Sequence, residues 1–166
     1  MANELELSGK GGTVTFKIRP KITISRDAVY HDPGLPGIGG SATTYRVTNN
    51  KKYSISVDFI ARTTQEAIDS IKDIRLLDSW LTSSIEIGQK PELLTLHGYG
   101  KLFRDISTVM TSCSYELSDA FDYINSGKEW IPIVVPLSFT LIESHTDVNA
   151  VAYNLTSFRE GTLQGY

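Results

Sequence analysis

The sequence contains a single cysteine, Cys113, in 166 residues. One thiol excludes an intrachain disulfide and a metal centre built on several thiolates. The simplest interpretation of Cys113 is a small apolar side chain in the interior. The chain also lacks any apolar run near the roughly 20 residues that a membrane-spanning helix needs. We therefore expect neither a disulfide framework nor a membrane partner.

A surplus of positive charge is missing as well. The chain has 16 Lys and Arg residues against 19 Asp and Glu residues, and its formal net charge is −3. Sustained binding to nucleic acid needs clustered basic side chains that neutralise phosphates, so this composition argues against it. The first dozen residues are polar and glycine-rich, without the apolar stretch of a signal peptide. We expect synthesis in the cytoplasm.

Signatures of catalysis and cofactor binding are absent too. Residues 98–101 end like a phosphate-binding loop, but Leu102 stands where that loop needs Ser or Thr, so a β-turn is the better interpretation. The three histidines, His31, His97 and His145, lack the spacing of metal ligands. The sequence predicts no catalytic residue, no cofactor and no metal site.

Alternation of apolar and polar residues predicts strands along much of the chain. Residues 13–18 alternate, and residues 22–24 keep the same parity, which predicts one strand interrupted at Pro20. Residues 43–48 and 53–62 predict a hairpin. The second of these is the most regular strand of the sequence.

One segment has the period of an amphipathic helix. Thr63 and Glu66 have the spacing of a capping box. Apolar residues then recur every three or four positions, which predicts a helix over about 64–83. We expect Ile71 and Leu77 to be buried against the β core.

The chain returns to β structure from residue 91. The run 106–116 is rich in Ser and Thr, and Thr108, Ser112 and Ser114 form a mostly polar face. Small hydroxyl side chains suit a strand that faces water or another subunit better than a dry core. Residues 115–130 are expected to form an irregular connection, and Pro132 and Pro136 predict that the strand over 133–141 has an edge or a bulge.

A Pro- and Gly-rich segment at about 31–42 cannot lie inside a helix or a central strand. We expect a long loop or the tip of a protruding arm that contacts another subunit. The residues assigned to this arm are Asp32, Pro33, Gly34, Leu35, Pro36, Gly37, Ile38, Gly39 and Gly40.

The order of these segments resembles the tail-tube fold of contractile-tailed bacteriophages, in particular the baseplate proteins that start the tail tube. The resemblance covers residues 17–145, as a single domain at 1–145, and leaves 146–166 as a polar C-terminal extension. It is carried by residues 45–47, 53–61, 76–81, 91–100, 106–115, 122–124, 130–133 and 143–145.

The resemblance implies a β-dominated α+β fold, a tail-tube-like β-sandwich or barrel with one helix, that forms rings. It implies a homohexamer at the baseplate of a virion, stacked against tail-tube and baseplate hub proteins. The polar face of Thr108, Ser112 and Ser114 would line a channel that DNA crosses only in transit. The implied protein is structural and is not an enzyme.

Two alternatives stay open. Another ring of the same fold, such as the tail tube itself or a tube terminator, belongs to the same class. A small β-rich hydrolase or ligand-binding domain, with a site assembled from His31, Asp32 and His97, belongs to a different one. A stable monomer with a concave pocket would favour the latter.

Overall fold

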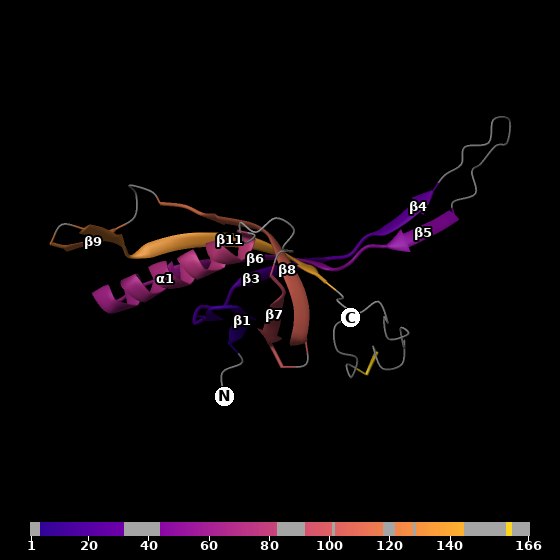
Figure 1. Ribbon diagram of the computed structural model, residues 1–166, viewed down its shortest axis with the longest axis horizontal. Coiled ribbons are helices and arrows are strands. Elements are labelled where there is room, and N and C mark those ends of the chain that lie inside the picture. The colour runs from indigo at the N-terminus through magenta and orange to yellow at the C-terminus, as the bar shows by residue number, and fades with distance from the viewer. Residues whose placement is uncertain are drawn as a thin grey trace.

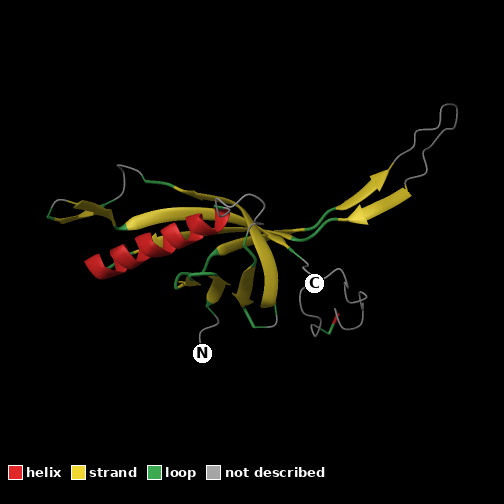
Figure 2. Ribbon diagram, viewed as in Figure 1, coloured by secondary structure: helices red, strands yellow, loops and turns green. Residues whose placement is uncertain are grey.

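The computed structural model describes residues 4–31, 44–82, 92–100, 102–117, 122–127, 129–144 and 159–160. The predicted arm residues from Asp32 to Gly40, and all of the 146–166 extension except 159–160, lie outside these ranges. The elements are β1 (Leu5–Gly9), β2 (Gly12–Phe16), β3 (Lys21–Ser25), β4 (Ala28–His31), β5 (Thr44–Thr48), β6 (Lys52–Ile60), α1 (Thr64–Leu81), β7 (Leu94–Gly98), β8 (Phe103–Tyr115), β9 (Tyr123–Ser126), β10 (Glu129–Pro132) and β11 (Val134–Glu143). The described chain is β-dominated with one helix, as the sequence predicts (Figure 2).

The main sheet has seven antiparallel strands in the order β2-β1-β7-β8-β11-β6-β3. Its two outermost strands, β2 and β3, are joined by residues 17–20 alone. That link spans at most about 18 Å, at roughly 3.5 Å per residue. The sheet must therefore curl until its edges approach each other. Within the described residues β2 and β3 do not pair, so the sheet is rolled but open and is not the closed barrel that the resemblance allows.

This topology corrects the prediction of one strand interrupted at Pro20. The segments on either side of Pro20 are separate strands at opposite edges of the sheet. Pro20 has no N–H to give to a ladder, and the chain leaves the sheet there to cross to the other edge. Parity alone could not reveal the crossing, because both strands place their apolar side chains toward the same core.

The core lies inside the curled sheet. β8 connects its two halves, because β7 pairs with the first half of β8 and β11 pairs with the second. Phe16 of β2 stacks on Phe139 of β11 with ring centroids 5.5 Å apart. The buried side chains include Leu5, Leu7, Val14, Phe16, Tyr53, Ile55, Leu77, Trp80, Leu94, Leu96, Phe103, Ile106, Met110, Leu137, Phe139 and Leu141.

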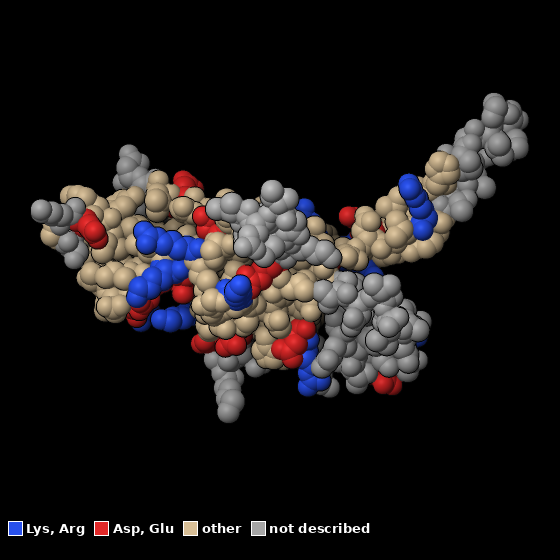
Figure 3. All heavy atoms as spheres, in the orientation of Figure 1, with Lys and Arg blue, Asp and Glu red and all other residues tan. Residues whose placement is uncertain are grey.

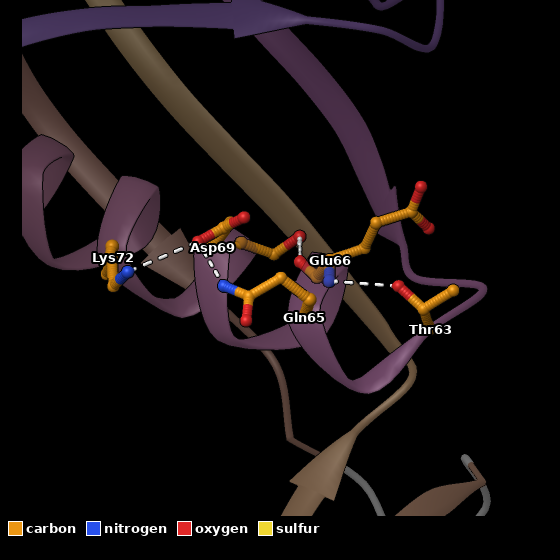
Figure 4. Close-up of polar contacts among 6 residues, drawn as sticks. Thr63, Gln65, Glu66, Asp69 and Lys72 are labelled. Carbon is orange, nitrogen blue, oxygen red and sulfur yellow. Dashed lines mark hydrogen bonds and ion pairs between the residues drawn. The ribbon is translucent and has the colours of Figure 1, made fainter.

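α1 begins where the sequence predicts. The Glu66 backbone N–H donates to Thr63 Oγ1 at 3.2 Å (Figure 4). The Glu66 carboxylate accepts from the Arg62 N–H at 2.8 Å. The carboxylate thus caps the residue before the N-cap, a small variation on the capping box. The helix ends at Leu81, two residues before the predicted end, where the Thr82 N–H donates to Ser79 O.

The buried residues of α1 are Ala67, Ile74, Leu77 and Trp80. Leu77 is fully buried, as predicted, whereas Ile71 is half-buried in a smaller cluster with Ala61 and Ile131. Near the C-terminal end of the helix, Trp80 Nε1 donates to Lys10 O at 3.0 Å and so joins α1 to the turn between β1 and β2.

The hairpin predicted from 43–48 and 53–62 is wrong. β5 pairs with β4 instead, and β6 lies between β11 and β3. The connecting residues do not reverse the chain, because the Asn49 N–H donates to Asp27 O at 2.8 Å and Lys51 O accepts from the Glu143 N–H at 2.9 Å. With these bonds, the chain continues from the β4–β5 hairpin directly into β6 of the main sheet.

Two hairpins lie at opposite ends of the molecule (Figure 1). One is β4–β5, which projects from the body. The other is β9–β10, which occupies part of the predicted irregular connection at 115–130. β11 lies inside the sheet, and its register shift with β8, between Thr140 and Leu141, is not at the prolines. At Pro136, β11 pairs with β6 while its ladder with β8 begins only at Leu137, which agrees with the predicted edge.

Candidate functional site

A polar surface covers one side of the sheet formed by β3, β6, β11 and the second half of β8. The strand registers align its side chains in two rows that cross all four strands. One row is Lys21, Ser56, Ser138 and Ser114, and the other is Thr23, Ser54, Thr140 and Ser112. We call the seven Ser and Thr residues of these rows the hydroxyl face.

The hydroxyl face is organised by short polar contacts. The Ser56 and Ser138 hydroxyl oxygens lie 3.1 Å apart, and the Ser114 hydroxyl donates to Ser138 O at 3.3 Å. Each hydroxyl can donate one hydrogen bond and accept others, so the face is suited to contact with water. Lys21 and Lys52 lie exposed on the same side as the exposed Asp58, so charges of both signs border the face.

Of the three residues predicted to share the lumen face, Ser112 and Ser114 lie exposed on the hydroxyl face. Thr108 does not. It is 0% exposed, and its hydroxyl donates to Leu94 O at 3.3 Å on the core side. The bulge opposite Thr140 and Leu141 inserts an extra residue into β8 and reverses the parity of the strand. The even spacing of Thr108, Ser112 and Ser114 therefore does not keep them on one side.

The opposite side of the same four strands faces the core. Ile55, Phe139 and Cys113 lie side by side there, in a row directly between the two hydroxyl rows. Ser54 and Ser56 could be found from the alternation of 53–62. The register that joins them to Ser138 and Thr140 could not, because it depends on pairing over more than 80 residues.

Both strands that flank the hydroxyl face have an unpaired edge within the described residues. β3 pairs with β6 on one side only. β8 pairs with β11 through Tyr115, but its pairing with β7 stops at Thr108. An unpaired edge presents free N–H and C=O groups and is a template for another chain. The polar face is thus bounded by two edges that can each accept a strand.

The β4–β5 hairpin, which we call the arm, stands clear of the body (Figure 3). It carries exposed large side chains: Tyr30 is 59% exposed, Tyr45 55% and Val47 45%. The two tyrosine rings contact each other edge to face, with centroids 5.9 Å apart. An isolated two-stranded ribbon is marginally stable in water, so the exposed aromatic surface is well placed to gain stability from a partner.

The root of the arm is fixed by a buried polar cluster. Glu143 is only 2% exposed, and its backbone C=O accepts from Asn50 Nδ2 at 2.9 Å. Burial lowers the pKa of Lys51, while the negative charge of Glu143 opposes that shift. Burial and the charge of Glu143 both raise the pKa of Tyr53. The arm therefore leaves the body from a packed base.

The residues of the alternative catalytic site are not brought together. His31 ends β4 on the arm, whereas His97 lies on β7 in the body, with its Nδ1 3.0 Å from Asp105 Oδ1. Asp32 lies outside the described residues. Burial raises the pKa of the Cys113 thiol to about 11, which disfavours the reactive thiolate. Across the described ranges, no three His, Cys, Asp or Glu residues are grouped to hold a metal ion, and no helix is long and apolar enough to cross a membrane.

No protein-family model matches this chain, and no curated protein matches it. Among solved structures, the chain is similar to one from an extracellular contractile injection system, the PVC sheath-tube complex in the extended state. That likeness has 13% sequence identity and a TM-score of 0.41, and covers 87% of this chain and 87% of the other.

A second likeness is to a chain in the tail of an empty GTA particle refined with C6 symmetry. It has 12% identity and a TM-score of 0.37, and covers 86% of this chain and 91% of the other. With TM-scores below 0.5, neither likeness establishes the fold or the role of this chain.

Proposed function

We propose that this chain is a structural subunit of a contractile phage-type tail, and that it works by closing into a ring around the tail channel. The single observation that carries the proposal is the hydroxyl face bounded by two unpaired strand edges. A polar face suits a water-filled channel, and closure of the sheet removes both edges at once.

In the ring, the edge of β3 in one protomer pairs with the edge of β8 in the next. The contact is heterologous, because two different edges meet, and such contacts close into rings when the rotation fits. The hydroxyl faces of neighbouring protomers then form one continuous wall. Thr23 and Ser112, which end one row, would become neighbours across the interface.

The wall suits the transit of DNA. A basic surface would hold phosphates by releasing counterions from the DNA. The hydroxyl face instead has uncharged side chains, and charges of both signs, from Lys21, Lys52 and Asp58, lie at its borders. DNA is therefore a passing contact and not a ligand in this proposal.

The sequence resemblance supports a proposal for the position of the ring and for its partners. That resemblance favours a homohexamer at the baseplate that starts the tail tube, stacked between hub and tube proteins within the virion. The tail tube itself and a tube terminator are the alternatives of the same class. The arm and its tip from Asp32 to Gly40 would contact a neighbouring subunit or ring through Tyr30, Tyr45 and Val47.

The test removes one edge without disturbing the sheet. The backbone N–H and C=O groups of Ser54 and Ser56 in β6 point toward β3. Their respective partners in β3, Thr23 and Lys21, therefore bond to β6. Because directions alternate along a strand, the backbone N–H of Ile24 points outward, away from β6. Ile24→Pro should give a folded monomer, whereas Ile24→Val should assemble like the parent. Native mass spectrometry and negative-stain microscopy read out the assembly.

Tyr115→Pro provides the same test at the edge of β8. It too should stay monomeric while circular dichroism reports a folded chain. A parent protein that remains monomeric at high concentration, or proline variants that assemble as well as the parent, would overturn the ring.

A further inference from the structure

β6 is longer than the strand beside it. β11 pairs with β6 from Lys52 to Ile60, but β3 pairs only as far as Ser56. Pro20 comes directly before β3 and has no N–H with which to extend the ladder. Among the described residues, the end of β6 after Ser56 therefore has no strand on its β3 side.

The backbone groups of that stretch can be assigned from the bonds at both ends of β6. Lys51 O accepts from the Glu143 N–H at 2.9 Å, and the Ala61 N–H donates to Ile133 O at 2.8 Å. The backbone N–H and C=O groups of the odd-numbered residues of β6 thus point toward β11. Because directions alternate along a strand, Asp58 and Ile60 point their N–H and C=O groups away from β11, into the open space.

A groove of about 350 Å³ lies along this open edge, between β6, the β2–β3 link and the first half of α1. Its charged lining residues are Asp58, Glu66, Asp69, Asp73, Lys17 and Arg62. Four carboxylates against two cations leave the lining net negative. Figure 4 shows Glu66 and Asp69 at the start of α1, one turn apart.

The negative charge is only partly compensated. Burial raises the pKa of Asp73, and the charge of Asp69 raises it further. Asp69 contacts Lys72 at 3.2 Å, but both side chains are more than half exposed. Exposed ion pairs of this kind contribute little stability, so a cation that enters the groove can compete with Lys72 for Asp69.

We propose that this groove binds an extended peptide segment with Lys or Arg at alternate positions, which adds to β6 as a short strand. In strand addition, the backbone groups of Asp58 and Ile60 form hydrogen bonds with the peptide main chain. Alternate side chains of the peptide reach into the groove. Side chains on one side of such a segment face Asp69 and Asp73. The groove is distinct from the two ring edges, so the inference stands independently of the proposed ring.

The probe is a fluorescein-labelled peptide of alternating Thr and Lys, with an alternating Thr and Glu peptide as its matched control. Fluorescence anisotropy with the full chain should show saturable binding of the Lys peptide alone. Ile60→Pro removes an outward-pointing N–H and should weaken binding about tenfold or more. Ile60→Val keeps that N–H and should bind within about twofold of the parent.

The contribution of charge is tested separately. The double variant Asp69→Asn, Asp73→Asn should weaken binding about tenfold and make it less sensitive to salt. A Lys peptide N-methylated at alternate backbone positions should not bind the unaltered protein, which tests strand addition without risk to folding. Equal binding of the Lys and Glu peptides, or of the methylated and unmethylated peptides, would overturn the proposal.

The occupant could instead be a second copy of this chain. Sedimentation without peptide would then show self-association that Ile60→Pro abolishes and Ile24→Pro does not. That result would overturn the assignment to a basic peptide partner and is distinguishable from loss of the ring.

Discussion

At the scale of single residues, burial separates two helix positions that the sequence treats alike. Leu77 is 0% exposed in the main core, whereas Ile71 packs half-buried in a smaller cluster. Leu77→Ala should lower the free energy of unfolding by about 2–5 kcal/mol, the usual loss for a filled core site. Ile71→Ala should cost clearly less. Urea titration of both variants measures the difference, and equal losses would contradict the packing described here.

Asp73 offers a prediction about charge. Its raised pKa means that the folded state binds its proton more tightly than the unfolded state does. Stability from this group is therefore greatest at low pH and falls as pH rises through the folded pKa. Asp73→Asn should raise the melting temperature at pH 7, and the gain should shrink toward pH 4.

Asp69 is the matched control for that prediction. Hydrogen bonds from Lys72 and Gln65 lower the pKa of Asp69, so its charged form is favoured in the fold. Asp69→Asn should therefore not raise the melting temperature at pH 7. A gain in both variants would mean that general repulsion, and not the burial of Asp73, sets the effect.

The residue scale also marks a limit of sequence reasoning. Parity predicted that Thr108, Ser112 and Ser114 share a face, and one bulge was enough to move Thr108 into the core. The bulge depends on how β8 meets β11, which lies almost thirty residues further along the chain. Composition and local alternation contain no information about that contact.

At the scale of elements, local signals were reliable and distant ones were not. The start of α1 was predictable, because Thr63 and Glu66 interact within one helical turn. The partner of residues 43–48 was not, because β4 and β6 are both plausible neighbours by propensity. The choice is made by contacts at the arm root, including Glu143 with Asn50, that join distant parts of the sequence.

The arm should change its dynamics on assembly. β4 and β5 pair only with each other within the described chain, and their large side chains are exposed. Hydrogen exchange of the free protomer should be fast across residues 28–31 and 44–48, since local opening exposes few buried contacts. In the assembled state the same amides should become protected. The amides of β6 should be protected in both states, and an arm protected equally in both would argue against a partner at the arm.

At the scale of the whole molecule, the fold class was predictable, but the surface that suggests a function was only partly so. The sequence pointed to serine- and threonine-rich strands. The structure adds that four such strands lie side by side and that the sheet they form ends in two unpaired edges. Which strand lies at an edge is a property of the complete sheet order, so no single segment could have revealed it.

If the hydroxyl face lines a channel, its charge should control contact with DNA. The double variant Ser112→Lys, Ser114→Lys should fold and still form rings, because both side chains point away from the core. It should also bind short duplex DNA with an affinity that falls steeply with salt. The measurement is fluorescence anisotropy of labelled DNA at several salt concentrations, with assembly checked by native mass spectrometry.

The matched control places the same charges outside the proposed wall. Gln65→Lys with Ser79→Lys adds two lysines at exposed positions of α1, which packs against the core side of the sheet. In a ring, lysines on the wall surround the DNA and act together, so the wall variant should bind more tightly and show the steeper salt dependence. Equal affinity and equal salt dependence in the two variants would mean that the hydroxyl face is an ordinary outer surface.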